Sequence, residues 1–378
     1  MRIGINAAGL GTENSGVETW TGGLIKGLAQ VDENNEYVIF ARRGVRPFDG
    51  EKMPENFMIH RIPLPPGGRM RRLMWEMMAL PRLAGSRDLD VLHCPAYVAP
   101  YNVDVPLVLT LHDLLVYTHP HVCRLRNRLH FHLRLPGSIR TAARIHCTSH
   151  WTRACLAGRH PETLGRARVV HPGIEEIFRP ADSGEVKKYL QRMGLREKPF
   201  VFVGNPEPKK NLRLLLHAFL LIKHQYGSSR RLLLVGGDGW PQGELDDLIE
   251  RLGLCGDVIR AGYVVRRQLP VIYSAAFAFV FPSEIEGFGL PPLEAMGCGA
   301  PVITTGAGGL SESVGAAALV LDNNSAANLA GAMHKLENTP ELRQKYSRAG
   351  RQRARIFRWP RVASLFPPIY REAFESER

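Results

Sequence analysis

Short apolar runs alternate with segments of helical periodicity along most of this chain. The runs at 37–41 (YVIFA), 106–112 (PLVLTLH) and 200–204 (FVFVG) are apolar at almost every position, which is typical of strands buried in a parallel sheet. Helical patterns at 17–29 and 212–224 each follow an apolar run after a loop. This alternation predicts an α/β fold that is built on parallel sheets.

The length of the chain predicts two domains, because 378 residues exceed what one hydrophobic core ordinarily serves. The pattern is interrupted at His171-Pro172-Gly173 and again at Pro180, so we place the linker at about 171–183. We therefore expect a first Rossmann-like domain over 1–172 and a second over 173–357.

The stretch 281–312 has the most distinctive pattern in the chain and reads FPSEIEGFGLPPLEAMGCGAPVITTGAGGLSE. It follows an apolar run at 275–280 and contains a glycine-flanked turn at Gly287-Phe288-Gly289. Two prolines after the turn suit the first turn of a helix, where missing N–H groups cost least. The stretch predicts a buried strand, a glycine-rich turn, a helix at 293–296 and a further strand at 301–304.

This turn has the chemistry of an anion-binding site. Its backbone N–H groups lie at a helix N-terminus, where the helix dipole also favours negative charge, and its glycines let a ligand approach the main chain. Glu286 and Glu294 bracket the turn with seven residues between them, and carboxylates suit paired hydroxyls because they accept several hydrogen bonds. A phosphate at the turn would place an attached sugar near Glu286 and an attached ribose near Glu294. An isolated glutamate pair would usually be solvated, and it is the surrounding pattern that favours a site.

A second loop carries two adjacent lysines. The apolar run at 200–204 is followed by Asn205-Pro206-Glu207-Pro208 and then by Lys209 and Lys210, just before the helix at 212–224. The helix dipole makes lysine unfavourable at a helix N-terminus, so a bound anion explains this placement better than two ordinary surface lysines. We predict that Lys210 is the principal phosphate ligand and that Lys209 is a secondary one.

His112 ends the apolar run at 106–112 and precedes Asp113. Ligands of doubly wound sheets lie at the carboxyl ends of strands, so we expect His112 to hydrogen-bond a sugar hydroxyl or to shape the reaction centre. Asp88 and Asp90 invite a metal interpretation, but they directly precede the short strand VLHCP and are better explained as loop residues. We predict no catalytic metal.

Composition narrows the class of protein further. The net charge of +13 implies anionic partners such as a nucleotide, a phospholipid surface or a polyprenyl phosphate, and the patterns of nucleic-acid-binding modules are missing. No apolar run approaches the ~20 residues of a membrane span, and the N-terminus lacks the apolar core of a signal peptide. Six cysteines without C-x-x-C spacing argue against a zinc site or a disulfide framework. We expect a cytoplasmic protein with reduced thiols and no cofactor.

Two basic segments in the first domain have two interpretations each. The segment 69–83 (RMRRLMWEMMALPRL) has helical character that Pro81 should limit. It either meets a membrane or a lipid-linked acceptor, or it is a packed helix with a charged end. The segment 114–161 contains eight arginines and no Asp or Glu, so it faces an anionic surface or acceptor, or it forms a solvated face.

The chain resembles the retaining nucleotide-sugar glycosyltransferases of the GT-B fold, the "group 1" family, through its Glu-x7-Glu region and over nearly its whole length. The resemblance implies two Rossmann-like domains facing a cleft, with the C-terminal segment 358–378 crossing back onto the first domain as an aromatic-rich helix over 359–374. It also implies metal-independent transfer of a sugar from a nucleotide-diphosphate sugar to an acceptor hydroxyl.

The same resemblance assigns roles to individual residues. The catalytic residues that it implies are His112, Glu286 and Lys210. Asn205 stands where many relatives have a basic residue, and Gly16 belongs to the glycine loop after the first strand. The substrate-binding residues that the resemblance implies are Gly16, Asn205, Lys209, Val264, Gly287, Phe288, Gly289, Leu290 and Glu294.

The segments 201–216 and 231–283 look most similar to mannosyltransferase-type members of the family. They favour a mannosyl donor, and the acceptor would be a glycan or a lipid-linked repeat unit of a surface polysaccharide. The basic first domain would then make peripheral contact with a membrane.

Three other functions remain open from the sequence. An epimerase on the same fold would isomerise a labelled donor instead of transferring its sugar. A nicotinamide oxidoreductase is disfavoured, because Gly9-Leu10-Gly11 is followed by Asn14 where the third glycine of the dinucleotide fingerprint belongs. A non-catalytic partner of another transferase would bind nucleotide without turnover.

Overall fold

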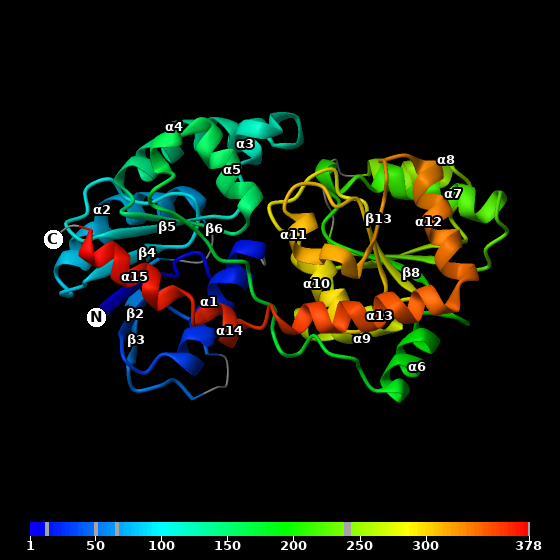
Figure 1. The fold of residues 1–378 in the computed structure, drawn as a ribbon, viewed down its shortest axis with the longest axis horizontal. Coiled ribbons are helices and arrows are strands. Elements are labelled where there is room, and N and C mark those ends of the chain that lie inside the picture. The colour runs from blue at the N-terminus through cyan, green and yellow to red at the C-terminus, as the bar shows by residue number, and fades with distance from the viewer. Residues whose placement is uncertain (12–14, 49–51, 65–67, 238–242, 377–378) are drawn as a thin grey trace. The chain divides into compact units, whose positions relative to one another are not determined.

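The computed structural model describes residues 1–11, 15–48, 52–64, 68–237 and 243–376. The chain forms two units, which are described separately (Figure 1). Unit 1 comprises Met1–Gly173 and Phe357–Arg378, and unit 2 comprises Ile174–Ile356. Each unit is an α/β domain on a parallel sheet, as the alternation of apolar runs and helical segments predicted.

Unit 1 contains a seven-stranded parallel sheet in the order β3-β2-β1-β4-β5-β6-β7. The chain winds outward from the neighbouring strands β1 and β4 in opposite directions, so the switch point of this sheet lies between them. The strands are β1 (Arg2–Asn6), β2 (Glu36–Arg42), β3 (Phe57–Ile62), β4 (Val91–Cys94), β5 (Leu107–Leu111), β6 (Arg144–Cys147) and β7 (Ala167–Val169).

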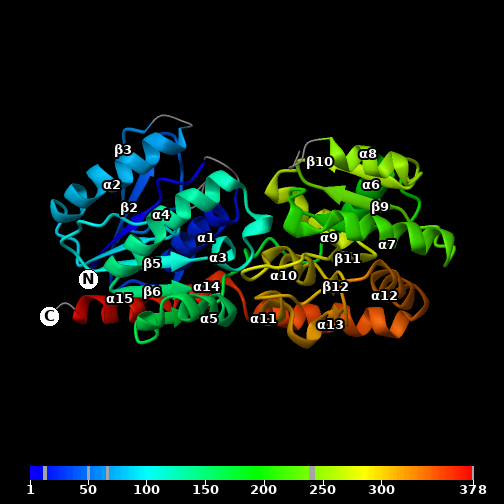
Figure 2. The same cartoon turned by 90° about the horizontal axis from the view of Figure 1, so that it is seen from above.

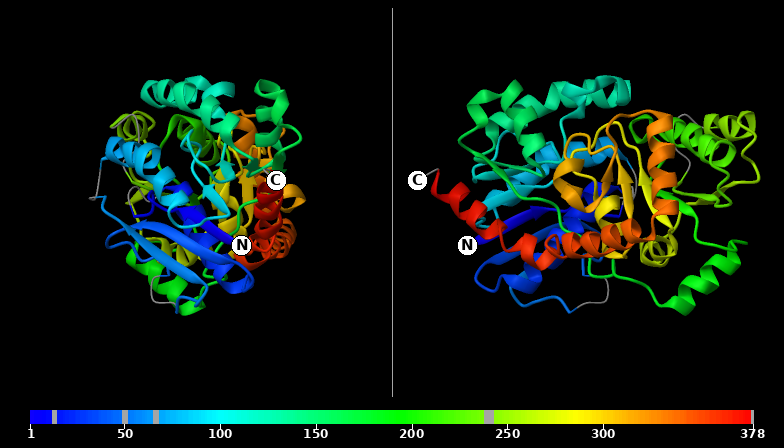
Figure 3. Two further views of the ribbon diagram at one scale, coloured as in Figure 1. Left: turned by 90° about the vertical axis from the view of Figure 1, so that its left-hand side faces the viewer. Right: turned by 45° about the vertical axis from the view of Figure 1, so that its right-hand side comes forward.

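Two hydrophobic cores cover the two faces of this sheet. One core includes residues of α1, α14 and α15, and the other includes residues of α2, α4 and α5. Figure 1 and Figure 3 show α15, in red, lying along the sheet, where it packs against β4, β5 and β6. The helices are α1 (Gly16–Val31), α2 (Arg69–Gly85), α3 (Leu115–Thr118), α4 (Leu125–Thr141), α5 (His150–Arg159), α14 (Trp359–Ala363) and α15 (Phe366–Glu375).

A chain of buried hydrogen bonds joins α15 to the sheet. The Tyr370 hydroxyl lies 3.0 Å from His93 Nδ1, and His93 Nε2 lies 2.7 Å from Thr110 Oγ1. Thr110 Oγ1 lies 3.1 Å from His146 Nδ1, and His146 Nε2 donates to the Val170 carbonyl at 2.8 Å. Burial lowers the pKa of both histidines, to about 3 for His146, so both rings are neutral at pH 7.

We predict that unit 1 loses stability as the pH falls from 6.5 to 5. The pKa of each buried histidine is lower in the folded state than the ~6.5 of the unfolded chain, so the unfolded state takes up protons first. Each histidine then costs about 2 kcal/mol at pH 5. Urea unfolding followed by tryptophan fluorescence measures this slope. The double variant His93→Gln/His146→Gln should flatten it and the exposed control His121→Gln should not; an unchanged slope in the double variant would contradict the prediction.

Helices α1 and α14 pack closely at glycines. A Cβ atom on Gly23 would lie 2.1 Å from the Trp359 ring, and one on Gly27 would lie 2.8 Å from the Ala363 Cβ. A Cβ atom on Gly22 would meet nothing within 4 Å. Gly23 and Gly27 therefore let α14, in the C-terminal segment of unit 1, pack directly against α1.

Gly23→Ala should destabilise the protein by about 1–3 kcal/mol, because the indole cannot move aside in a packed core. Gly22→Ala on the same helix should stabilise it by up to about 1 kcal/mol, because alanine is the better helix former. Denaturant midpoints of the two variants test the difference, and equal midpoints would refute the packing argument.

Unit 2 contains a six-stranded parallel sheet in the order β10-β9-β8-β11-β12-β13, which Figure 2 shows from above. Its switch point lies between β8 and β11. The strands are β8 (Phe200–Val203), β9 (Leu232–Val235), β10 (Val258–Gly262), β11 (Ala278–Phe281), β12 (Val302–Thr304) and β13 (Leu319–Val320). The helices are α6 (Ser183–Arg192), α7 (Leu212–His224), α8 (Glu244–Arg251), α9 (Leu269–Ala275), α10 (Leu290–Gly297), α11 (Leu310–Val314), α12 (Ala326–Asn338) and α13 (Pro340–Arg355).

Three sequence predictions of element boundaries were wrong. Pro81 does not limit its helix, because α2 continues through it to Gly85 while Leu80 and Ala84 pack into the core. The expected single C-terminal helix is divided into α14 and α15, since two prolines after Phe366 start a new helix. The apolar run at 275–280 begins with the last residue of α9, so the strand itself starts at Ala278.

Candidate functional site

The two loops that the sequence singled out lie together in unit 2. The lysine loop follows β8 and the glycine turn follows β11, and these strands are neighbours at the switch point of the sheet. The Glu284 N–H donates to the Lys209 carbonyl at 2.7 Å, which holds the two loops together. Parallel pairing of two apolar strands is therefore what brings residues more than 70 positions apart into one site.

The carboxylate of Glu286 accepts a hydrogen bond from Lys210 Nζ at 2.5 Å and lies 3.5 Å from Lys209 Nζ. Burial alone would raise the pKa of Glu286, but the two ammonium groups outweigh burial and hold its pKa at about 2. Lys210 Nζ also lies 4.5 Å from the centre of the Phe281 ring. Lys209 Nζ also lies 4.0 Å from the exposed carboxylate of Glu207, so the two cations meet two carboxylates, of which only Glu286 is buried.

The backbone of the glycine turn is tightly constrained. The Gly309 N–H donates to the Glu286 carbonyl at 2.9 Å, and a Cβ atom on Gly309 would lie 2.0 Å from the Gly287 carbonyl oxygen. Gly289 has φ of +91° and precedes α10 without a side-chain cap. The first turn of α10 has backbone N–H groups without an acceptor inside the helix, and that of Leu290 is one of them. Phe288 is buried, so the turn would offer its main chain to a ligand.

The neighbouring loops also need glycine. A Cβ atom on Gly236 would lie 2.1 Å from the Gly204 carbonyl oxygen. Asn205 is exposed, and its Oδ1 accepts a hydrogen bond from the Gly237 N–H at 3.2 Å. Val264 is half-buried in the loop that follows β10. Both predicted binding residues therefore lie at the same edge of the sheet as the lysine loop.

Glu294 is buried and belongs to a charge network with half-buried partners that the sequence did not predict. One of its oxygens accepts from Arg266 Nη2 at 2.8 Å and the other from the Tyr273 hydroxyl at 3.0 Å. Arg266 Nε also donates to Glu175 at 2.6 Å. Burial opposes the charge of Arg266, but the two carboxylates raise its pKa above the ordinary value. The network fixes the Glu294 carboxylate, whose oxygens keep further lone pairs for a ligand.

No local sequence signal marked Arg266, Tyr273 or Glu175. Glu175 lies within the predicted linker, and Arg266 lies in a short 3-10 helix after β10. The side chains of these three residues come together with Glu294 only in the folded chain, where distant segments meet.

In unit 1, His112 lies at the carboxyl end of β5, as predicted. His112 Nε2 donates to the Pro95 carbonyl at 2.8 Å, and the ring packs edge-on against Trp20. His112 Nδ1 has no hydrogen-bond partner in the described part of the chain. Burial lowers the pKa of His112, so its Nδ1 is an unprotonated acceptor at pH 7. Gly16 starts α1 directly after the capping residue Ser15.

A pocket of about 230 Å³ opens at the switch point of the first sheet. Its lining includes Asn6 at the end of β1 and Tyr97 after β4, with Glu76 from α2 and Phe131 from α4. Asn6 Nδ2 donates to Glu76 Oε1 at 3.2 Å, and Arg72 Nε lies 3.9 Å from the same oxygen. Burial raises the pKa of Glu76. The pocket thus combines an aromatic wall with a buried carboxyl group.

The aspartates that suggested a metal have structural roles. Asp90 Oδ2 accepts the Arg2 N–H at 2.7 Å and joins the starts of β1 and β4. Asp88 has φ of +49°, in the left-handed region that suits a tight turn. The interpretation of both as loop residues agrees with this geometry.

Family models match both units of the chain. The model described as "Glycosyl transferases group 1" matches residues 187–353, and the one described as "Glycosyltransferase Family 4" matches residues 14–176. The O-antigen chain mannosyltransferase B of Escherichia coli is 30% identical over 270 residues, which are 71% of this chain and 71% of that protein. The chain spans about half the length of other matched relatives, such as 54% of the D-inositol 3-phosphate glycosyltransferase of Acidothermus cellulolyticus, at 34% identity over 61% of this chain.

Solved structures share the fold over nearly the full length. The sucrose-phosphate synthase from Thermosynechococcus elongatus superposes with a TM-score of 0.80 at 22% identity and covers 100% of both chains. The Anabaena protein Alr3699/HepE in complex with UDP-glucose gives a TM-score of 0.77 at 17% identity, over 97% of this chain and 98% of that one.

Proposed function

Since the chain belongs to the group 1 glycosyltransferases of the GT-B fold, we propose that it transfers a sugar from a nucleotide-diphosphate sugar to an acceptor hydroxyl with retention of configuration and without a metal. The observation that carries this proposal is the pairing of Lys209 and Lys210 with Glu286 at the switch point of the second sheet.

The leaving diphosphate needs positive charge as the glycosidic bond breaks. Lys210 is held in place by Glu286 and by the Phe281 ring, so its charge is positioned before the donor binds. Such preorganised charge costs no rearrangement during the reaction. Lys209 and the N–H groups around Gly287 and Leu290 add to it, and Asn205 and Val264 bound the nucleotide. These groups allow the diphosphate to leave without a metal.

Other side chains would hold the sugar and the ribose. The Glu286 carboxylate accepts sugar hydroxyls while its low pKa keeps it ionised. Glu294 accepts ribose hydroxyls with the lone pairs that Arg266 and Tyr273 leave free. His112 Nδ1 accepts a sugar hydroxyl as a neutral ring. We assign these three contacts from the donor and acceptor character of each group.

The name of the E. coli relative favours mannose as the transferred sugar. A thermal-shift screen of UDP, GDP and ADP sugars identifies the donor nucleotide. Incubation of the stabilising, labelled donor with acceptor then tests the reaction. Transfer of label supports the proposal, isomerised donor would indicate an epimerase, and nucleotide binding without turnover would indicate a non-catalytic partner.

For the acceptor, we propose a glycan or lipid-linked saccharide in the pocket of unit 1. Asn6 and Glu76 offer polar contacts to hydroxyls, and Tyr97 and Phe131 offer aromatic faces for a sugar ring. Arg72 supplies a positive charge for a phosphate on the acceptor.

The two helices that wall this pocket carry exposed apolar stripes. Leu125, Leu129 and Leu133 on α4 are 62–75% exposed at a spacing of four residues. Met70, Met74 and Met78 on α2 are 57–68% exposed with the same spacing. Arginines flank both stripes, and no acidic residue occurs over 114–161. Apolar side chains framed by cations fit an anionic membrane surface. None of the described helices is both long and apolar enough to cross a membrane.

We predict that Leu125→Ser/Leu129→Ser/Leu133→Ser reduces co-sedimentation with anionic phospholipid vesicles at least about tenfold, since each exposed leucine contributes about 1 kcal/mol or more on insertion. The control Leu164→Ser/Leu365→Ser removes two other exposed leucines of unit 1 and should bind normally. Equal binding of the triple variant would exclude α4 as the contact.

A further inference from the structure

A groove in unit 2 lies at the amino ends of the strands, whereas the lysine loop lies at their carboxyl ends. Lys198 precedes β8, Phe277 precedes β11 and Pro301 precedes β12, and all three line a groove of about 660 Å³. The proposed donor residues follow the same strands. In a parallel sheet all amino ends of the strands lie on one side and all carboxyl ends on the other, so this groove is separate from the donor site.

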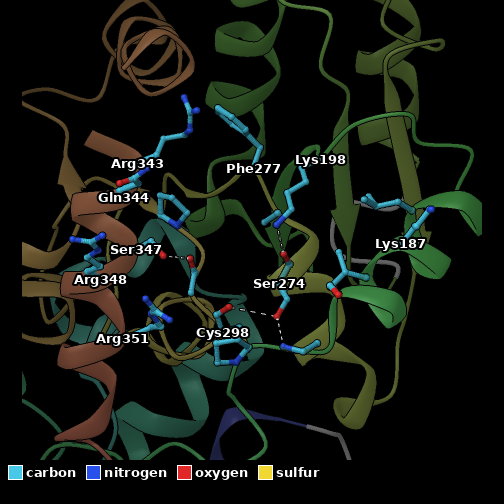
Figure 4. A pocket seen from close by; sticks show the side chains of 18 residues that line it. Lys187, Lys198, Ser274, Phe277, Cys298, Arg343, Gln344, Ser347, Arg348 and Arg351 are labelled. Carbon is cyan, nitrogen blue, oxygen red and sulfur yellow. Dashed lines mark hydrogen bonds between the residues drawn. The ribbon is translucent and has the colours of Figure 1, made fainter. Parts of the chain in front are cut away.

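The charge of the groove has one sign. Its basic residues are Lys187 of α6, Lys198, and Arg343, Arg348 and Arg351 of α13, and no Asp or Glu is among the described residues that line it. Figure 4 shows the arginines of α13 on one side, Lys187 on the other and Lys198 between them. An anion in the groove would meet cations from two helices.

Several of these cations have no internal counter-ion. Arg348, Arg351 and Lys187 make no hydrogen bond or ion pair with any residue that the structure describes. Lys198 Nζ donates only to the Ser274 carbonyl, at 2.8 Å, and burial lowers the pKa of Lys198. These side chains keep their donors available for a ligand.

The floor of the groove is apolar. It includes Val186, Leu190, Ala276 and Pro301. Two of the lining hydroxyls are already used, because Ser274 Oγ accepts the Ala181 N–H at 3.0 Å and Ser347 Oγ donates to the Gly299 carbonyl at 2.8 Å. Ser183 and Gln344 are the other uncharged polar side chains of the lining. The floor thus offers hydrocarbon contact and few groups that would recognise a nucleobase or a sugar.

From this combination we propose that the groove binds an amphiphilic phosphate: a phosphate or diphosphate carried by a hydrocarbon chain, with its oxygens on Arg348 and Arg351 and its chain on the apolar floor. Bidentate guanidinium contacts suit phosphate oxygens, and burial of the chain adds affinity that an inorganic anion cannot gain.

Calorimetric titration of the full chain with farnesyl diphosphate, inorganic pyrophosphate and farnesol tests this site. We expect farnesyl diphosphate to bind at least about tenfold more tightly than either fragment, since it uses both the cations and the floor. Arg348→Gln/Arg351→Gln should reduce the number of farnesyl diphosphate molecules bound per chain by one. The control Lys345→Gln/Arg355→Gln removes two exposed charges of the same helix that do not line the groove and should leave the number unchanged.

An unchanged stoichiometry in the groove variant would overturn the proposal, and so would pyrophosphate binding as tightly as farnesyl diphosphate. The same titration with the Lys210→Ala variant tests this site separately from the proposed transferase activity. Its groove should still bind farnesyl diphosphate even if the donor assignment fails.

Discussion

Lys210→Ala should lower kcat/KM for the nucleotide-sugar donor by about 100- to 1,000-fold, the cost of removing one preorganised charge from a developing anion. In the folded protein Lys210 is the closest cation to Glu286, at 2.5 Å. The substitution removes the main contact to the leaving diphosphate and leaves Glu286 with Lys209 at 3.5 Å. Steady-state kinetics with the donor found in the nucleotide screen measure the loss.

Stability must be separated from catalysis in this experiment, because breaking a buried ion pair costs about 3–5 kcal/mol. The double variant Lys210→Met/Glu286→Gln removes both charges of this pair and leaves Lys209 with Glu207, at 4.0 Å, so it should recover much of the stability but none of the activity. Lys188→Ala removes an exposed lysine of α6 and serves as the matched control. Recovery of turnover in the double variant would show that Lys210 acts only by supporting the fold.

Glu294→Ala should weaken donor binding by about 10- to 100-fold, because hydrogen bonds from hydroxyls to a charged group contribute about 1.5–3 kcal/mol. The structure fixes this carboxylate between Arg266 and Tyr273, so it meets the ribose without rearranging. Calorimetry of the nucleoside diphosphate compares the dissociation constants of the variant and the wild type.

Nucleotides with 2′,3′-dideoxyribose, which lacks both hydroxyls, distinguish a ribose contact from general damage to the loop. If Glu294 binds the ribose hydroxyls, the penalty of Glu294→Ala should largely disappear when the ligand lacks them. Tyr273→Phe removes one of the two bonds that hold the carboxylate and should have a smaller effect. A penalty that is the same for ribose and 2′,3′-dideoxyribose nucleotides would refute the ribose assignment.

The sequence predicted those parts of the fold that depend on local pattern. Buried parallel strands are continuous apolar runs, so β5 and β8 could be recognised from composition alone. The helix after the lysine loop was predicted at 212–224, which agrees with α7. The lysine loop and the glycine turn were found because each combines charge or glycine with a strand end and a helix start.

What the sequence could not predict depends on tertiary packing. Pro81 lies inside α2, since burial of Leu80 and Ala84 overrides the local preference of proline to end a helix. The partners of Glu294 come from two other segments and have no common motif. The hydrogen bond between Tyr370 and His93, and those that join both His93 and His146 to Thr110, connect elements that are far apart in the chain. Such contacts follow from topology and not from periodicity.

The contribution of the diphosphate to binding tests most directly whether the lysine loop binds the phosphates of the donor. Calorimetry should compare a nucleoside diphosphate with its nucleoside on the wild type and on Lys210→Ala. We predict that the diphosphate increases the affinity of the wild type at least about 100-fold, the scale of two charge-assisted contacts, and that this ratio collapses in Lys210→Ala while nucleoside binding is unchanged. An equal ratio in the two proteins would contradict the assignment of the lysine loop to the donor phosphates.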